Sequence, residues 1–260
     1  MSAFVLKLIA CVCMLADHIG YFEPGMPVLR IVGRLAMPIY VYLLVEGFQH
    51  TSNRRRYALR LLVFAVLSQI PFGLLFNRDP LYPVGSVMVT LLLGYLCIWI
   101  LEALKEKPIL RLFALAAIIG LCVVLDLGLV KTDYGAKGIL LILVFRFFAP
   151  PVLDREKSLL RRILFALLLC LLAAAALYHV PLLKFALYEG SVVIGREAAL
   201  PVLSAWEKKQ VFALCAIPLI LFYNGKRGLA TRSRASRKVI QYAFYAFYPV
   251  HMVILYFIFC

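Results

Sequence analysis

Residues 84–102 read VGSVMVTLLLGYLCIWILE and residues 109–128 read ILRLFALAAIIGLCVVLDLG, with the short charged segment ALKEKP between them. An α-helix rises about 1.5 Å per residue, so about 20 apolar residues cross the hydrocarbon core of a bilayer. Each of the two runs has roughly that length. The pair is therefore predicted to form two membrane-spanning helices that are joined by a tight loop.

The same pattern repeats along the whole chain, in which 64% of the 260 residues are hydrophobic and only 16% are charged. A soluble domain has a much smaller apolar share, because it must present a polar surface to water. We predict an all-α fold, a polytopic transmembrane helical bundle of about nine spans that forms a single domain over residues 1–260. The predicted spans are residues 3–22, 28–49, 58–77, 84–102, 109–128, 135–152, 160–180, 209–223 and 239–259.

Residues 181–210 fit this pattern less well, because charged side chains such as Glu189, Arg196 and Glu197 interrupt their apolar runs. Counting them as a further span would also place the basic cluster that follows on the wrong side of the membrane. We predict an interfacial or re-entrant element at the outer face, where irregular backbone is covered by protein or by water.

The formal net charge of +15 is concentrated in a few short loops between apolar runs. Such clusters orient a membrane protein and do not indicate nucleic-acid binding. All four clusters fall on one side if the N-terminus is cytoplasmic and the C-terminus is outside. They are Arg54, Arg55, Arg56 and Arg60; Lys105, Lys107 and Arg111; Arg155, Lys157, Arg161 and Arg162; and Lys226, Arg227, Arg232, Arg234, Arg237 and Lys238.

Five polar residues inside the apolar runs are the candidate catalytic groups: Asp17, His18, Arg30, Arg34 and His251. A charge within a bilayer costs several kcal/mol, so an intramembrane ionisable residue indicates a functional site. Counting residues along the predicted spans brings all five to one layer toward the outer face. Histidine exchanges protons near neutral pH, and this layer could therefore perform acid-base chemistry.

Structural roles explain the same residues in other ways. Asp17 could pair with Arg34 to hold two helices together, or it could orient the ring of His18. Adjacent residues on a helix point about 100° apart, so the sequence leaves both alternatives open. Either histidine could instead form a hydrogen bond between helices.

A possible phosphate site lies at the opposite, basic face. The segment Asn224-Gly225-Lys226-Arg227-Gly228 combines two cations with two glycines that let backbone amides turn inward. Arg54, Arg55 and Arg56 lie in the basic cluster before the third span. Both groups could also be ordinary topology signals.

Several ordered motifs resemble those of the TraX family, multi-pass membrane proteins named for the pilin N-acetylase of conjugative plasmids. The resemblance covers nearly the whole chain. The motifs are Leu15-Ala16-Asp17-His18-Ile19-Gly20, Arg30-Ile31-Val32-Gly33-Arg34-Leu35-Ala36-Met37-Pro38, Glu46-Gly47-Phe48, Ser68-Gln69-Ile70-Pro71-Phe72, Asp133-Tyr134-Gly135, Tyr223-Asn224-Gly225-Lys226-Arg227-Gly228 and Phe247-Tyr248-Pro249-Val250-His251.

The resemblance implies an acyltransferase of the bacterial cytoplasmic (inner) membrane that uses cytosolic acetyl-CoA as acyl donor and needs no metal. Asn224, Lys226 and Arg227, with Arg54 to Arg56, are then expected to bind the CoA phosphates. His18, or alternatively His251, would act as general base or carry the acyl group, and Arg30 or Arg34 would stabilise the oxyanion. The acceptor is an amine or a hydroxyl on a peptide N-terminus, a sugar or a lipid.

Two other functions agree with the same pattern. A proton-coupled transporter or permease would use a histidine, aspartate and arginine layer to relay protons. A non-catalytic membrane scaffold of a conjugation or secretion system would need no such layer. The sequence shows no paired inverted repeats, which speaks against the transporter, and the cost of burying these polar groups speaks against the scaffold.

Overall fold

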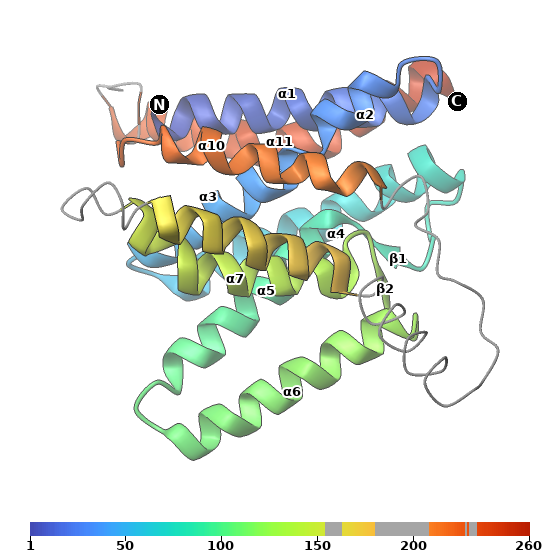
Figure 1. The fold of residues 1–260 in the computed structure, drawn as a ribbon. Helices are drawn as coiled ribbons and strands as arrows, with labels where there is room; N and C mark the ends of the chain where they lie inside the picture. Colours follow the sequence, from blue (N-terminus) through green and yellow to red (C-terminus); the bar gives the residue numbers. More distant parts are fainter. Residues whose placement is uncertain (154–162, 180–207, 227, 229–232) are drawn as a thin grey trace, which may run out of the picture.

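The computed structural model describes residues 1–153, 163–179, 208–226, 228 and 233–260 (Figure 1). In these residues the chain is almost wholly helical, which confirms the predicted all-α class. The helices are α1 (Ala3–Phe22), α2 (Pro27–Gly33), α3 (Ala36–His50), α4 (Arg54–Asn77), α5 (Val87–Ala103), α6 (Pro108–Asp126), α7 (Gly135–Leu153), an unlabelled helix Ile163–His179, the 3₁₀ helix η1 (Gln210–Cys215), α10 (Ala216–Leu221) and α11 (Arg234–Phe259).

Each of the nine predicted spans coincides with helix in the described residues. Five helices there are long and apolar enough to cross a membrane: Ala3–Phe22, Pro27–His50, Arg54–Asn77, Pro108–Asp126 and Lys238–Phe259. Val87–Ala103, Ile163–His179 and Gln210–Leu221 are shorter apolar helices. The predicted outer-face element at residues 181–210 falls almost entirely in residues 180–207, which lie outside the described part of the chain.

The bundle is built around α3 and α4, which bring the two halves of the chain together. α1 packs against α2, α3 and α11, while α4 lies between α11 and α5. α7 contacts α3, α5 and α6. Figure 1 shows α1 and α11 running side by side in the same direction, with the N-terminus and the C-terminus at opposite ends of the bundle.

Two predicted spans are interrupted, and a proline explains each interruption. The span at residues 28–49 is divided into α2 and α3 at Arg34 and Leu35. Pro38 has no N–H to bond the carbonyl of Arg34, so the regular helix ladder is broken there. Pro218 likewise cannot bond the carbonyl of Leu214, in the segment where the 3₁₀ helix η1 passes into α10.

The described basic clusters lie at the end of the bundle where the chain begins. The Ala3 amide donates to the Lys226 carbonyl at 2.9 Å, which ties the N-terminus to the 223–228 loop. Arg54 to Arg56 form the first turn of helix α4, directly after its N-cap residue Asn53. The sequence pattern predicts them in a loop, whereas the structure shows that they are helical. The cluster at residues 155–162 lies outside the described residues.

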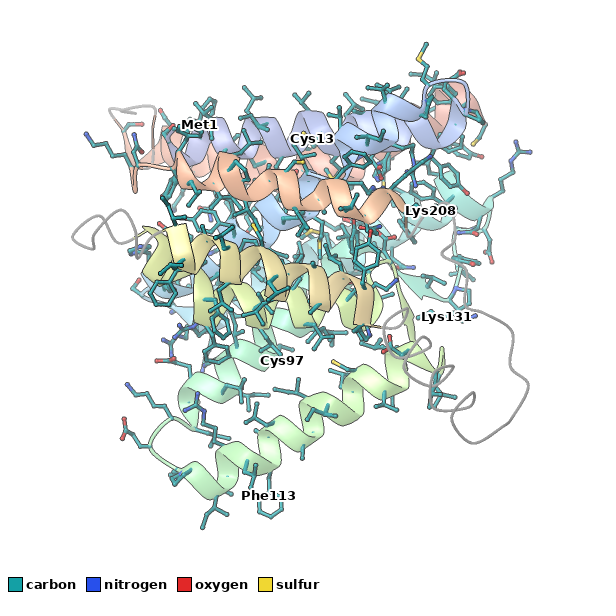
Figure 2. All side chains as sticks on the ribbon, in the orientation of Figure 1. Met1, Cys13, Cys97, Phe113, Lys131 and Lys208 are labelled. Atoms are coloured by element: carbon teal, nitrogen blue, oxygen red, sulfur yellow. The ribbon has the colours of Figure 1, made fainter. Side chains whose placement is uncertain are left out.

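The opposite end of the bundle carries a small parallel sheet of β1 (Val84–Gly85) and β2 (Lys131–Thr132). In Figure 2, Lys131 lies at this end and Met1 lies at the other. The connections here contain Glu23, Asp79 and Asp133. The described basic clusters thus lie at one end of the bundle and connections of mixed charge, which include Arg78 and Lys131, lie at the other, as the predicted topology requires.

Helix α6 stands apart from the main bundle and exposes an apolar surface. Phe113 points away from the other helices in Figure 2, and 69% of its surface is exposed. Ile109 and Ile119 are exposed to 71% and 64%. Large exposed apolar faces are unfavourable in water, so this surface is suited to contact lipid.

The arrangement of the termini predicts the result of a reporter experiment. A reporter fused after Cys260 should be detected outside the cytoplasm, and one inserted between Lys105 and Lys107 should be detected inside it, because basic loops remain cytoplasmic. The measurement is paired alkaline phosphatase and fluorescent protein activity in cells. Detection of both reporters on one side would contradict the proposed orientation.

Candidate active site

The carboxylate of Asp17 on α1 is shared by two arginines. Arg30 of α2 donates to the Asp17 carboxylate at 2.9 Å and to its backbone carbonyl at 3.0 Å. Arg34, immediately after α2, donates to the other carboxylate oxygen. The Arg34 side chain is only 4% exposed, against 15% for Asp17 and 17% for Arg30. The three groups form an ion cluster that fixes α2 on α1 and leaves one positive charge in excess.

Gly33 makes this cluster possible. A Cβ atom placed at Gly33 would lie 2.6 Å from the Cα of Asp17 and would overlap its side chain. Only glycine therefore lets α2 approach α1 closely enough for both arginines to reach one carboxylate.

His18 and His251 form a direct hydrogen bond between α1 and α11. The Nδ1 of His18 lies 2.8 Å from the Nε2 of His251, and the ring planes differ by 13°. Both residues are buried, with 9% and 4% of their surfaces exposed. Counting residues along the predicted spans had placed these histidines and the ion cluster in one layer, and the structure brings them together.

The neighbours of His251 determine how protons are arranged in the pair. The Nδ1 of His251 lies 2.7 Å from the backbone carbonyl of Phe247, which can only accept a hydrogen bond. The Nδ1 of His251 must therefore carry a proton, and in the neutral ring its Nε2 is then a hydrogen-bond acceptor. His18 consequently donates a hydrogen bond from its own Nδ1 to the Nε2 of His251. The Nε2 of His18 then carries an unshared electron pair and is the basic atom of the pair.

Asp17 has no hydrogen bond to His18 within the described residues. Of the two alternatives that the sequence left open, the contact with Arg34 is the one in the structure, and Arg30 is a second partner. His251 instead orients the ring of His18, and Phe76 packs against that ring edge-on at 5.2 Å.

Asp133 and Tyr134 join the layer from the connection between β2 and α7. The carboxylate of Asp133 interacts with Arg30 and Arg34, and the hydroxyl of Tyr134 lies near the same two arginines. Surrounding protein atoms remove part of the hydration of the Asp133 carboxyl and raise its pKa to about 6, although solvent still reaches the side chain. Sequence reasoning assigned no role to these residues, although the Asp133-Tyr134-Gly135 motif was a visible signal.

A cavity of about 800 Å³ runs from the basic end of the bundle toward the histidine pair. Gly225 and Gly228 line it at the basic end. Met14 and Tyr248 line it near the histidines, since Met14 lies one turn before His18 and Tyr248 lies three residues before His251. Its volume is that of a typical small-molecule or cofactor site.

The predicted phosphate-binding residues lie at the basic end, but most of their side chains are outside the cavity lining. Arg54 stacks on Phe48 at 4.6 Å, and Arg55 and Arg56 are exposed. The Asn224 side chain accepts a hydrogen bond from the Lys226 amide and so shapes the loop, while the Lys226 side chain is exposed. Arg227 lies outside the described residues.

The family model described as TraX protein matches residues 2–259. The chain belongs to the TraX family. Five helices among its described residues are long and apolar enough to span a bilayer, so this TraX family member is a membrane protein. The layer of Asp17, His18, Arg30, Arg34 and His251 therefore lies within a TraX domain that covers nearly the whole chain.

Two curated proteins resemble this TraX family member. It is 30% identical over 268 residues to the probable fimbrial assembly protein FimC, serogroup H1, of Dichelobacter nodosus, covering 98% of this chain and 94% of that protein. It is 29% identical over 91 residues to the uncharacterized protein RP591 of Rickettsia prowazekii (strain Madrid E), covering 35% and 34% of the two chains. No solved structure matches this TraX sequence.

The ion cluster predicts a stability effect for Asp17→Asn. The substitution removes the negative charge that Arg30 and Arg34 share, and the Arg34 guanidinium is buried, so the free energy of unfolding should fall by about 3–5 kcal/mol. Denaturation in detergent would measure this loss. Glu106→Gln is the control, because its ion pair with Lys105 is exposed and should contribute less than about 1 kcal/mol. Equal stability of the two variants would contradict the structural role of the cluster.

The close approach at Gly33 predicts a second effect. Gly33→Ala should separate α2 from α1 and lower the unfolding temperature, since the new methyl group meets Asp17. Gly120→Ala in α6 is the control, because nothing lies within 4 Å of its added Cβ and alanine favours a helix by about 1 kcal/mol over glycine. An unchanged unfolding temperature in Gly33→Ala would show that the two helices need not be so close.

Proposed function

We propose that the protein is a membrane-embedded acyltransferase that moves an acetyl group from cytosolic acetyl-CoA to an amine or hydroxyl acceptor. The observation that carries the proposal is the cavity, which begins at the basic end and reaches within about one helical turn of the histidine pair. A long donor bound there would have its phosphates among cations and its thioester near a base. The acceptor would approach from the opposite end, past Arg30 and Asp133.

In the proposed reaction, the Nε2 of His18 accepts a proton from the acceptor as its nitrogen or oxygen attacks the thioester carbonyl. The carbon–sulfur bond then breaks, and the proton passes from His18 to the departing thiolate. His251 holds the His18 ring in the required tautomer through the 2.8 Å hydrogen bond. The excess positive charge of Arg30 and Arg34 over Asp17 would stabilise the oxyanion that forms on the carbonyl oxygen.

The location and orientation follow from the same proposal. The protein would lie in the bacterial cytoplasmic membrane with its basic end inside, where acetyl-CoA is available. Asn224, Lys226 and Arg227 with Arg54, Arg55 and Arg56 would form a positive rim that attracts the donor.

The family supports a role in the assembly of surface appendages. The full-length relative from Dichelobacter nodosus is named as a fimbrial assembly protein. We propose that the acceptor belongs to such a system, as a peptide N-terminus, a sugar or a lipid on the outer side of the membrane.

The proposed role of His18 predicts a large loss of turnover in His18→Ala. Loss of a general base usually lowers the rate about 10² to 10⁴ fold. His251→Ala should lose less, because His18 remains present although its tautomer is no longer fixed. The assay is release of free CoA thiol from acetyl-CoA by purified protein in detergent with an amine acceptor, and acetyl-CoA affinity should change little.

His179→Ala serves as the control for the histidine variants. His179 pairs with Asp126 at 2.7 Å, on helices outside the proposed site, and its turnover should match the wild type. A larger loss in His251→Ala than in His18→Ala would transfer the base to α11. Absence of thiol release from the wild-type protein would favour a transporter or a scaffold.

A further inference from the structure

Arg60 lies inside the predicted span of α4 and lines the cavity. Its guanidinium lies 5.3 Å from the centre of the Tyr57 ring and interacts with the hydroxyl of Tyr245. Lys7 of α1 lines the same cavity and lies 5.6 Å from the centre of the Phe244 ring. Two cations on different helices thus line the same cavity, on the side of the histidine pair that faces the basic end of the bundle.

Arg60 forms no ion pair with a carboxylate of the residues that the structure describes. The described chain places no carboxylate within ion-pair distance of Arg60, and its Nε is buried without a hydrogen-bond partner. An uncompensated charge at this depth is costly, and buried charges are normally paired. Because Arg60 also lines the cavity, its charge indicates an anion that is supplied from outside the chain.

The acidic residue of the cavity does not provide this compensation. Glu46 of α3 accepts a hydrogen bond from the Tyr223 hydroxyl at 3.0 Å and lies 3.3 Å from the Nε2 of His50. Arg60 and Lys7 carry two positive charges against the one negative charge of Glu46, so these three lining residues give the cavity a positive balance.

We propose that Arg60, assisted by Lys7, is the phosphate-binding site of the cavity and that its ligand is a phosphorylated amphiphile. A guanidinium forms paired, charge-assisted hydrogen bonds with phosphate oxygens. The aromatic rings of Tyr57, Phe244 and Tyr245 line the same space and can pack on an adenine ring or an alkyl chain. The phosphate comes either from a nucleotide such as CoA or from an anionic lipid headgroup.

The proposal deepens the proposed function, on which the choice of CoA as ligand rests. Lys7 and His18 are eleven residues apart on α1, so their levels differ by about 16 Å along the helix axis. The extended pantetheine arm of CoA covers a distance of this order between its diphosphate and its sulfur. A phosphate at Arg60 and Lys7 would thus bring the thioester to the histidine layer. Arg54 to Arg56 lie outside the cavity lining and would attract the donor without holding its phosphate there.

Binding of CoA without an acyl group tests the site separately from catalysis. The probe is radiolabelled CoA, with purified full-length protein in detergent. Arg60→Ala should weaken binding about 10- to 100-fold, because it removes a charge-assisted contact. Arg60→Lys should retain part of the affinity, and Lys107→Ala, which removes an exposed lysine outside the cavity lining, should change it less than about twofold.

A lipid source gives a different result. In nanodiscs that contain phosphatidylglycerol, native mass spectrometry would then detect a retained anionic lipid that Arg60→Ala releases, with CoA affinity unchanged. Retention of both CoA and anionic lipid in Arg60→Ala would overturn the proposal. Normal CoA binding by a wild-type protein without acyl transfer would leave the phosphate site intact and reject the acyltransferase.

Loss of CoA binding in Arg60→Ala could also result from misfolding, so the unfolding temperature provides a second measurement. A structural arginine stabilises the fold, so its removal would lower the unfolding temperature. An arginine whose role is to bind an anion destabilises the protein when no ligand is bound, because its charge is then unpaired. Without ligand, Arg60→Met should therefore unfold at the same temperature as the wild type or at a higher one. Excess CoA should then raise the unfolding temperature of the wild type and not that of Arg60→Met. A lower unfolding temperature for Arg60→Met, with an unchanged response to CoA, would contradict the proposal.

Discussion

The hydrogen-bonded ion cluster of Asp17 with Arg30 and Arg34 is the constraint on which the rest of the site depends. It fixes the rotation of α1, because Asp17 must face α2, and the next residue, His18, then points about 100° around the helix toward α11. A buried ion cluster contributes little net stability compared with apolar packing, but it defines the register of the helices strictly. The position of the histidine pair is therefore a consequence of the ion cluster.

The break in the second span serves the same geometry. Arg30 lies in α2 and Arg34 lies just beyond its last residue, where Pro38 interrupts the helix ladder. An uninterrupted helix would still place both arginines on one face, since they are one turn apart. The break lets α3 leave in a new direction and form the wall of the cavity, while the short α2 remains on α1.

The level of the polar residues along the bundle axis could be predicted from the sequence, whereas contacts between helices could not. Counting residues placed Asp17, His18, Arg34 and His251 in one layer, because the rise per residue of a helix is constant. It could not choose the partner of Asp17, since that depends on how each helix is rotated about its axis. Arg60 was read as part of a basic cluster for the same reason: the sequence shows that a cation follows Arg54 to Arg56, but not that its side chain enters a cavity.

The use of a second histidine in place of an acid has a chemical consequence. In a His–Asp pair, the carboxylate holds the base and neutralises the imidazolium. Here the carboxylate is engaged by two arginines, and the neutral His251 holds the base, anchored by the Phe247 carbonyl. When His18 takes up a proton, its hydrogen bond to His251 becomes charge-assisted and stronger. In the proposed reaction, the positive charge that forms would still lie near two guanidiniums. Their repulsion would favour return of the proton to a leaving thiolate.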